Sequence, residues 1–225
     1  MMVVDACQGR FRRETLTTAL ENGVVVLYTG SKFYRGPPFS GAVFVPKETM
    51  LRLQELKDPI IPKGLFTFIG RSELPKELVS WRTQLPESVN IGLVLRWEAA
   101  LAEIEATLAI DEDERMSLIK QWRQRLVELI ERRAPCLNYF SEAQDTDSIV
   151  SVRVRNPFQE QESRPWLKKA ELALIFKAMT LDLSSEFKDL DQSIISRKCF
   201  MGQPVLISKD EAVLRVALGS DSLRQ

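Results

Sequence analysis

Polar residues follow two apolar segments near the beginning of the chain. Asp5 and Gln8 come directly after the apolar run 1–4. The tetrapeptide Thr-Gly-Ser-Lys at 29–32 comes directly after the β-branched run 24–28. In open α/β sheets, ligand sites lie at the carboxyl ends of the strands. We therefore expect both polar groups, which carry a carboxylate, an amide, hydroxyls and an amine, to lie at a ligand-binding edge.

Each of these groups also has an ordinary structural explanation. An aspartate at the end of a strand is commonly a turn or helix-cap residue, and a lysine after Gly-Ser is commonly a solvated loop residue. The tetrapeptide lacks the leading glycine of a phosphate-binding P-loop. The two groups together, over one strand–helix–strand unit, are less common than either group alone. The combination is therefore what suggests function.

The elements that would position these groups have an α/β pattern. Apolar runs and glycine punctuation predict a buried strand, a helix stopped by Gly23, a second strand and, after a turn segment rich in Gly and Pro, a third strand. These elements occupy residues 1–4, 12–22, 24–28 and 42–45. Strand, helix, strand, loop, strand is the layout of an α/β domain.

The remainder of the chain predicts long helices followed by a smaller α+β region. Apolar residues from Val94 to Leu108, and again around Trp122, recur at three- and four-residue spacing, which marks one apolar face of a helix. Residues 148–154 alternate between apolar and polar, as in a half-exposed antiparallel strand. A helix at 166–181 and short strands follow. We expect two domains, at 1–111 and 112–225.

The composition excludes several classes of function. Lys+Arg and Asp+Glu are 31 each, so no net positive field is present to gather nucleic acid. The chain has no histidine, which excludes Ser-His-Asp and Cys-His catalysis and most zinc sites. The three cysteines match no metal-ligand spacing and fit a reducing cytoplasm. No stretch approaches the ~20 apolar residues of a membrane span. We expect a cytoplasmic protein without metal, nucleic-acid or membrane partners.

The order of these motifs resembles the active-site core of fold-type I pyridoxal-phosphate (PLP) enzymes, in the class V aminotransferase and cysteine desulfurase group. The resemblance lies in Asp-x-x-Gln, a helix and strand, Thr-Gly-Ser-Lys, and a Gly-Pro loop before a short strand. It implies a fold class: α/β, the C-terminal part of a large PLP-binding domain followed by a small α+β domain. It also implies pyridoxal 5'-phosphate as the cofactor.

The resemblance also implies a role for each matching residue. Lys32 would form the Schiff base with the cofactor, Asp5 would pair with its protonated ring nitrogen, and Gln8 would contact its phenolic oxygen. A lysine must lose its proton to attack an aldehyde, and a buried carboxylate keeps the ring nitrogen charged. Thr29 and Ser31 would hold the phosphate. The family usually has a histidine at the second position, so Ser31 can donate a hydrogen bond but supplies no positive charge.

One substrate residue follows from the same resemblance. Arg215, in the apolar run 212–218, resembles the small-domain arginine that grips a substrate carboxylate through two parallel hydrogen bonds. The alternative is a strand arginine paired with a local acid. The resemblance therefore implies an amino acid as the substrate.

Family members are longer, and their additional segments precede the strand that ends at Asp5. We therefore expect a fragment or subunit of a PLP-dependent aminotransferase-like enzyme, inactive alone. Its partner would be a second copy in a homodimer or a polypeptide that supplies the N-terminal half. Cys7, Cys136 and Cys199 do not lie where a desulfurase needs its mobile cysteine, which favours transamination or a related lyase or hydrolase reaction. The alternatives are a non-catalytic remnant or interaction module, and an unrelated α/β binding domain.

Overall fold

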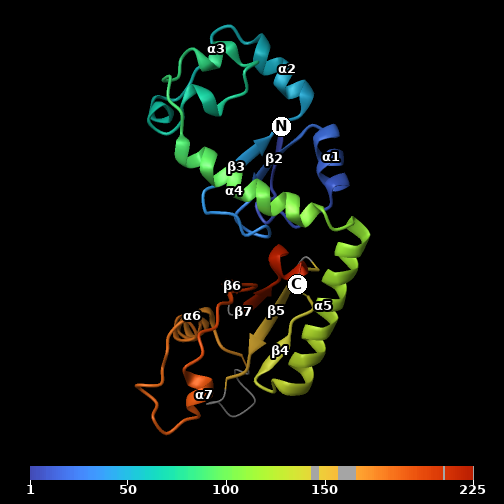
Figure 1. Ribbon diagram of the computed structural model, residues 1–225, viewed down its shortest axis with the longest axis vertical. Coiled ribbons are helices and arrows are strands. Elements are labelled where there is room, and N and C mark those ends of the chain that lie inside the picture. Colours follow the sequence, from blue (N-terminus) through green and yellow to red (C-terminus); the bar gives the residue numbers. More distant parts are fainter. Residues whose placement is uncertain (143–146, 157–165, 210, 225) are drawn as a thin grey trace. The chain divides into compact units, whose positions relative to one another are not determined.

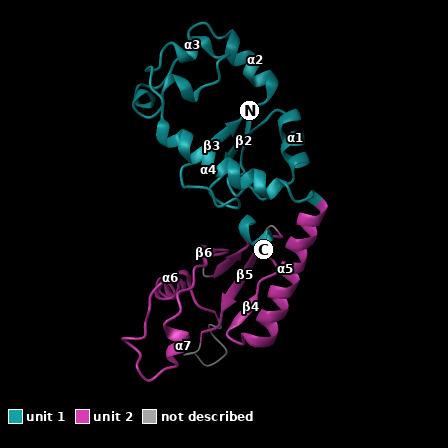
Figure 2. Ribbon diagram, viewed as in Figure 1, with its two compact units in different colours: residues 1–112, 219–225 teal, residues 113–218 magenta. Residues whose placement is uncertain are grey.

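The computed structural model describes residues 1–142, 147–156, 166–209 and 211–224 (Figure 1). The chain divides into two compact units (Figure 2): Met1–Glu112 together with Gly219–Gln225, and Asp113–Leu218. The expected second domain, 112–225, differs from the second unit because the residues after Leu218 group with the first unit.

The first unit is built on a three-stranded sheet with the order β1-β2-β3. The strands are β1 (Met2–Asp5), β2 (Val24–Thr29) and β3 (Gly41–Phe44). β1 and β2 are parallel and are joined by helix α1 (Arg13–Glu21), whereas β3 is antiparallel to β2. Gly23 takes a positive φ of 76° after α1, which explains why the helix ends there. The predicted mixed α/β layout is confirmed.

The expectation that residues 1–4 form a buried strand is wrong. Strand β1 is the edge of the sheet, and the side chains of Met2, Val3 and Val4 are 65%, 50% and 42% exposed. The central strand β2 buries Val25 and Val26 instead. Within the described residues, β1 pairs on one side only, so its apolar side chains and unpaired main-chain groups form an open edge.

Helix α4 (Ile91–Leu108) covers the sheet near β2 and β3 (Figure 1). Asn90 begins the helix, because its side-chain oxygen accepts a hydrogen bond from the Leu93 N–H at 3.0 Å. The Trp97 indole donates to the Gly41 carbonyl at 3.1 Å, and Ala100 is fully buried. The expected apolar stripe is only partly used, since Val94, Leu101 and Leu108 are exposed.

Shorter elements connect β3 to α4. They are helix α2 (Lys47–Glu55), the 3₁₀ turns η1 (Lys63–Thr67) and η2 (Arg71–Glu73), and helix α3 (Val79–Arg82). After the second unit, a third 3₁₀ turn, η3 (Ser220–Leu223), completes the first unit and packs against α4.

The second unit contains an antiparallel sheet with the order β4-β5-β7-β6. Its elements are α5 (Glu112–Arg133), β4 (Leu137–Tyr139), β5 (Ile149–Val154), α6 (Lys169–Ala178), α7 (Gln192–Ile195), β6 (Gly202–Leu206) and β7 (Ala212–Ala217). Its core joins Ile130 of α5, Val150 and Val152 of β5, Leu172 of α6 and Leu214 of β7.

Strand β5 corrects another expectation. Its alternating pattern predicted one exposed face, but the first four residues are all buried, including the polar Ser151 at 0% exposure. Val150 and Val152 on one face pack against Ile130 of α5 and Leu172 of α6. Ile149 and Ser151, which point to the other face, are buried as well. Among the described helices, none has the length and hydropathy required to cross a membrane.

Candidate functional site

The two polar groups that follow β1 and β2 lie at the same edge of the first sheet. Because the strands are parallel, Asp5 lies opposite Leu27, close to the end of β2. Beyond the strands, the Phe33 N–H donates to the Gln8 carbonyl at 3.3 Å. The main chain that follows Asp5 is therefore bonded directly to the main chain that follows Lys32.

Asp5, Cys7 and Lys32 form an interacting group at this edge. The Cys7 N–H donates to Asp5 Oδ1 at 3.0 Å. This hydrogen bond, with a second one from the thiol, holds the pKa of the exposed Asp5 carboxyl below its usual value. The same carboxylate raises the pKa of the Cys7 thiol, and the positive charge of Lys32 acts in the opposite direction. Both charged groups thus act on one thiol, which behaves as a hydrogen-bond donor rather than a nucleophile.

Thr29 has a structural role within the loop that carries Lys32. Its hydroxyl donates to the Ser40 carbonyl at 2.9 Å, accepts from the Ser31 N–H at 3.2 Å and lies 2.9 Å from the Ser31 hydroxyl. A hydroxyl has a single proton to donate. While Thr29 gives that proton to Ser40, the Ser31 hydroxyl is the donor in its 2.9 Å contact with Thr29, so the Ser31 hydroxyl must rotate away from Thr29 before it can donate to an anion.

Two glycines of this loop allow close packing against α4. A Cβ at Gly36 would lie 2.7 Å from the Ala100 Cβ and 2.9 Å from the Gly30 carbonyl oxygen. A Cβ at Gly30 would lie 2.7 Å from the Ala100 Cβ. In the structure, Gly36 therefore serves the contact between the loop and the helix.

Arg10 is a residue at this edge that the motif comparison did not single out. Its guanidinium lies 5.1 Å from the centre of the Phe33 ring, and its Nε donates to the Gln8 side-chain oxygen at 3.5 Å. Burial lowers the pKa of Arg10 to about 10. The signal in the sequence was the group of arginines shortly after Gln8, at positions 10, 12 and 13.

Arg215 lies in the second unit, so the structure does not test its expected contact with a substrate. In β7 it pairs with Ser151 of β5 and with Gly202 of β6. A Cβ at Gly202 would lie 2.9 Å from the Arg215 carbonyl oxygen, so glycine is needed for this close strand pairing. The substrate role of Arg215 stays a prediction.

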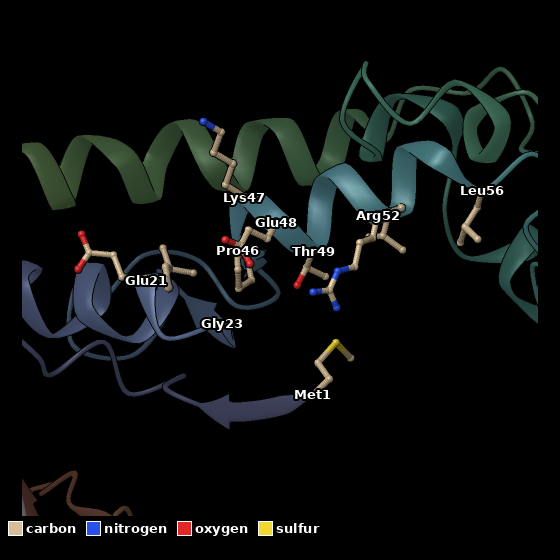
Figure 3. A pocket seen from close by; sticks show the side chains of 11 residues that line it. Met1, Glu21, Gly23, Pro46, Lys47, Glu48, Thr49, Arg52 and Leu56 are labelled. Carbon is tan, nitrogen blue, oxygen red and sulfur yellow. The ribbon is translucent and has the colours of Figure 1, made fainter.

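A pocket of about 640 Å³ lies away from the predicted site (Figure 3). Met1 and Gly23 line it, and they precede β1 and β2, whereas Asp5 is the last residue of β1 and Lys32 follows β2. A four-residue strand spans roughly 13 Å, which separates the two ends. Arg52 points toward Met1 in this pocket. The pocket and the site predicted around Lys32 therefore lie at opposite ends of the strands.

Tyr28, in β2, provides a test of how the first sheet packs. Its ring contacts Phe11, Phe44 and Trp97, with centroids 5.9, 5.4 and 6.5 Å away. Burial, together with Tyr34, raises the pKa of the Tyr28 phenol. The pKa of this phenol is higher in the folded state than the unfolded value of ~10. Its contribution to the stability of the folded state is therefore fully present below pH ~10 and is lost as the pH rises further.

We therefore expect the melting temperature of Tyr28→Phe to fall less steeply than that of the wild type as the pH rises above ~10. The measurement is the melting temperature as a function of pH, together with the absorbance of the phenolate. The reference is the wild type, measured over the same pH range. Equal slopes for Tyr28→Phe and the wild type would contradict the burial of this phenol.

Comparisons with known proteins identify no family for this chain. It is a mixed α/β protein; no family model matches it, and no curated protein matches it. Among solved structures, the crystal structure of mouse CSAD in apo form, a PLP-dependent decarboxylase of fold type I, is similar at 12% sequence identity and a TM-score of 0.49. The match covers 99% of this chain and 43% of that chain. The chain thus spans less than half the length of this neighbour, and a likeness this distant identifies no family.

Proposed function

We propose that this chain is part of a PLP-dependent enzyme that acts on an amino acid. In this proposal the amine of Lys32 would form the Schiff base with the aldehyde of the cofactor. The observation that carries the proposal is the hydrogen bond between the Phe33 N–H and the Gln8 carbonyl. It joins the segment of Asp5 and Gln8 to that of Lys32 at the carboxyl edge of two parallel strands, where α/β sheets bind ligands.

The residues at this edge have the donor and acceptor types that PLP requires. The ionised carboxylate of Asp5 suits a protonated ring nitrogen, and the amide of Gln8 suits an oxygen. When bound, PLP supplies an electron sink for the charge that develops at the amino acid's α-carbon. In this proposal Cys7 keeps Asp5 ionised by donating to it, so that Asp5 can hold the proton on the ring nitrogen.

The phosphate side of the site differs from the family pattern. Ser31 supplies a hydroxyl but no charge, and Thr29 is engaged with Ser40. Arg10 brings a cation next to Gln8 and over the ring of Phe33, the neighbour of Lys32. We therefore assign the missing positive charge to Arg10. A guanidinium binds phosphate through two parallel hydrogen bonds, which a serine cannot replace.

The open edge of β1 supports the partner that the proposal requires. Met2, Val3 and Val4 are exposed in a strand of a type that is normally buried in parallel sheets. In this proposal a polypeptide that supplies the N-terminal half, or a second copy of the chain, covers that edge. Aminotransferase chemistry, and the grip of Arg215 on the substrate carboxylate, belong to the assembled enzyme.

The exposed edge also favours a second candidate function. A strand that presents unpaired N–H and C=O groups can pair with a strand of another protein without any catalysis. In that role the chain would be an interaction module that keeps the fold, and Lys32 would be an ordinary loop lysine, exposed as the structure has it.

Labelling of Lys32 distinguishes the two functions. In the assembly with the polypeptide that covers the edge of β1, we expect pyridoxal phosphate to give a yellow absorbance and, after borohydride reduction, to remain attached mainly to the peptide that contains Lys32. Lys32→Ala should lose both signals. Lys47→Ala is the control, because Lys47 is an equally exposed lysine that lines the pocket at the other end of the strands. Label distributed evenly over exposed lysines would support the interaction module and exclude the enzyme.

A further inference from the structure

The segment 219–224, where the chain returns to the first unit, folds onto the loop that carries Lys32. The Ser220 N–H donates to the Phe33 carbonyl at 2.8 Å, and Ser220 is fully buried. Phe33 directly follows Lys32, and its own N–H already donates to the Gln8 carbonyl. The peptide groups on both sides of Phe33 are therefore held, one by the segment after β1 and the other by residues 219–224.

An ion pair strengthens the contact between the segment and the loop. Arg35 Nη1 lies 2.8 Å from Asp221 Oδ2. Arg35 has a φ of +56°, in the left-handed region that residues with side chains rarely adopt. Such a conformation persists where the surrounding structure enforces it, and glycine would take it without strain. Asp221 is the ion-pair partner that the structure gives this arginine, and a glycine at the position could not form that pair.

Two further features fit the segment to this place. A Cβ at Gly219 would lie 2.7 Å from the Arg35 Cδ and 2.7 Å from Asp221 Oδ1, so a larger residue would displace the side chains of this ion pair. At the other end, Arg224 forms an ion pair with Glu103 of α4, the helix that packs on Gly36. The segment is thus attached at the Phe33 carbonyl, at Arg35 and at α4.

We propose that residues 219–224 position the Lys32 loop, through the hydrogen bond from Ser220 to Phe33 and the ion pair between Asp221 and Arg35. This role rests on the proposed function of Lys32, whereas the attachment of the segment to the loop does not. The residues named act on Lys32 through the loop and are positioning residues. Because the segment follows β7 directly, the chain that leaves the second unit ends on the loop of the candidate lysine.

Two substitutions test the positioning role. Asp221→Asn removes the charge of one partner, and Arg35→Gly removes the other while relieving the left-handed backbone. If Arg35 were only a loop residue, Arg35→Gly would leave the loop unchanged or firmer. We expect instead that both variants raise hydrogen-exchange rates at residues 33–36 by roughly two- to fivefold, the range for an exposed ion pair.

The second measurement is the share of reduced pyridoxal-phosphate label that lies on Lys32 rather than Lys47. We expect both variants to lower this share, and the exchanged pair Arg35→Asp with Asp221→Arg to restore it. Glu128→Gln is the matched control, because it removes the exposed ion pair between Arg125 and Glu128 in the second unit. This control should change neither measurement.

The outcomes separate this proposal from the proposed function. Unchanged exchange at residues 33–36 in both variants overturns the positioning role. Faster exchange with equal Lys32 labelling in variants and wild type also overturns it, while the proposed function survives. Faster exchange in both variants, together with a wild-type protein that takes no label at Lys32, supports the attachment of residues 219–224 and overturns the proposed function.

Discussion

Gly36→Ala should lower the free energy of unfolding by roughly 3 kcal/mol, at the upper end of the range for overpacking a filled site. An added Cβ would lie 2.7 Å from the Ala100 Cβ, 2.9 Å from the Ala100 Cα and 2.9 Å from the Gly30 carbonyl oxygen. Two of these three atoms are main-chain atoms, so no side-chain rotation relieves the contact. The loop must move away from α4, and Lys32 lies on the same loop. Urea unfolding, followed by circular dichroism, measures the loss.

The matched control for this prediction is Gly41→Ala. Gly41 ends the same loop, and a Cβ added there would meet nothing within 4 Å. Its effect should stay within ~0.5 kcal/mol, as for most substitutions at the surface. Ala100→Gly, combined with Gly36→Ala, should recover only part of the loss, because the contact with the Gly30 carbonyl remains. If Gly36→Ala and Gly41→Ala unfold at the same urea concentration, the close packing of the loop against α4 is wrong.

The parts of the fold that could be predicted from sequence depend on local patterns. The helix expected at 12–22 is α1 at Arg13–Glu21, and the strand expected at 24–28 is β2 at Val24–Thr29. Glycine stops the helix at Gly23 and β-branched residues form the strand, and both effects act within a few residues. These two elements therefore follow from the sequence to within a residue or two, whereas the helix expected at 166–181 is the shorter α6 at Lys169–Ala178.

Burial could not be predicted in the same way, because it depends on distant neighbours. The apolar run 1–4 has the composition of a buried strand, yet β1 is an edge. Residues 148–154 alternate as a half-exposed strand does, yet β5 is an interior strand. The period of the pattern fixes which residues share a face. Which strands and helices cover that face is decided by segments far away in the chain.

In the candidate site too, only the features that depend on local sequence patterns could be predicted. That the groups after β1 and β2 lie at one edge follows from a parallel pair of strands, and the structure brings them together. The engagement of Thr29 with Ser40 depends on the course of the loop, which no motif encodes. The ion pair between Arg35 and Asp221 joins residues 186 positions apart, so it has no local signal. The PLP roles of Asp5, Gln8 and Lys32 come from resemblance and stay predictions.

Leu172→Ala should remove roughly 2–5 kcal/mol of the free energy of unfolding, the range for a large-to-small change in a core. Leu172 is on α6 and is fully buried. It belongs to the core cluster of the second unit with Val150, Val152 and Leu214. Three of its partners are on the central strands β5 and β7, so the cavity would lie where helix and sheet meet. Faster hydrogen exchange in β5 and β7 should accompany the lower unfolding midpoint.

Leu174, two positions along the same helix, supplies the control. It is 68% exposed, so Leu174→Ala removes the same atoms from the same element without leaving a cavity. Its effect should stay within ~0.5 kcal/mol. Because helix propensity changes equally in both variants, the difference between them isolates the contribution of burial. The face of α6 assigned to the core is wrong if the two leucine variants unfold at the same denaturant concentration, and it is reversed if Leu174→Ala is the less stable of the two.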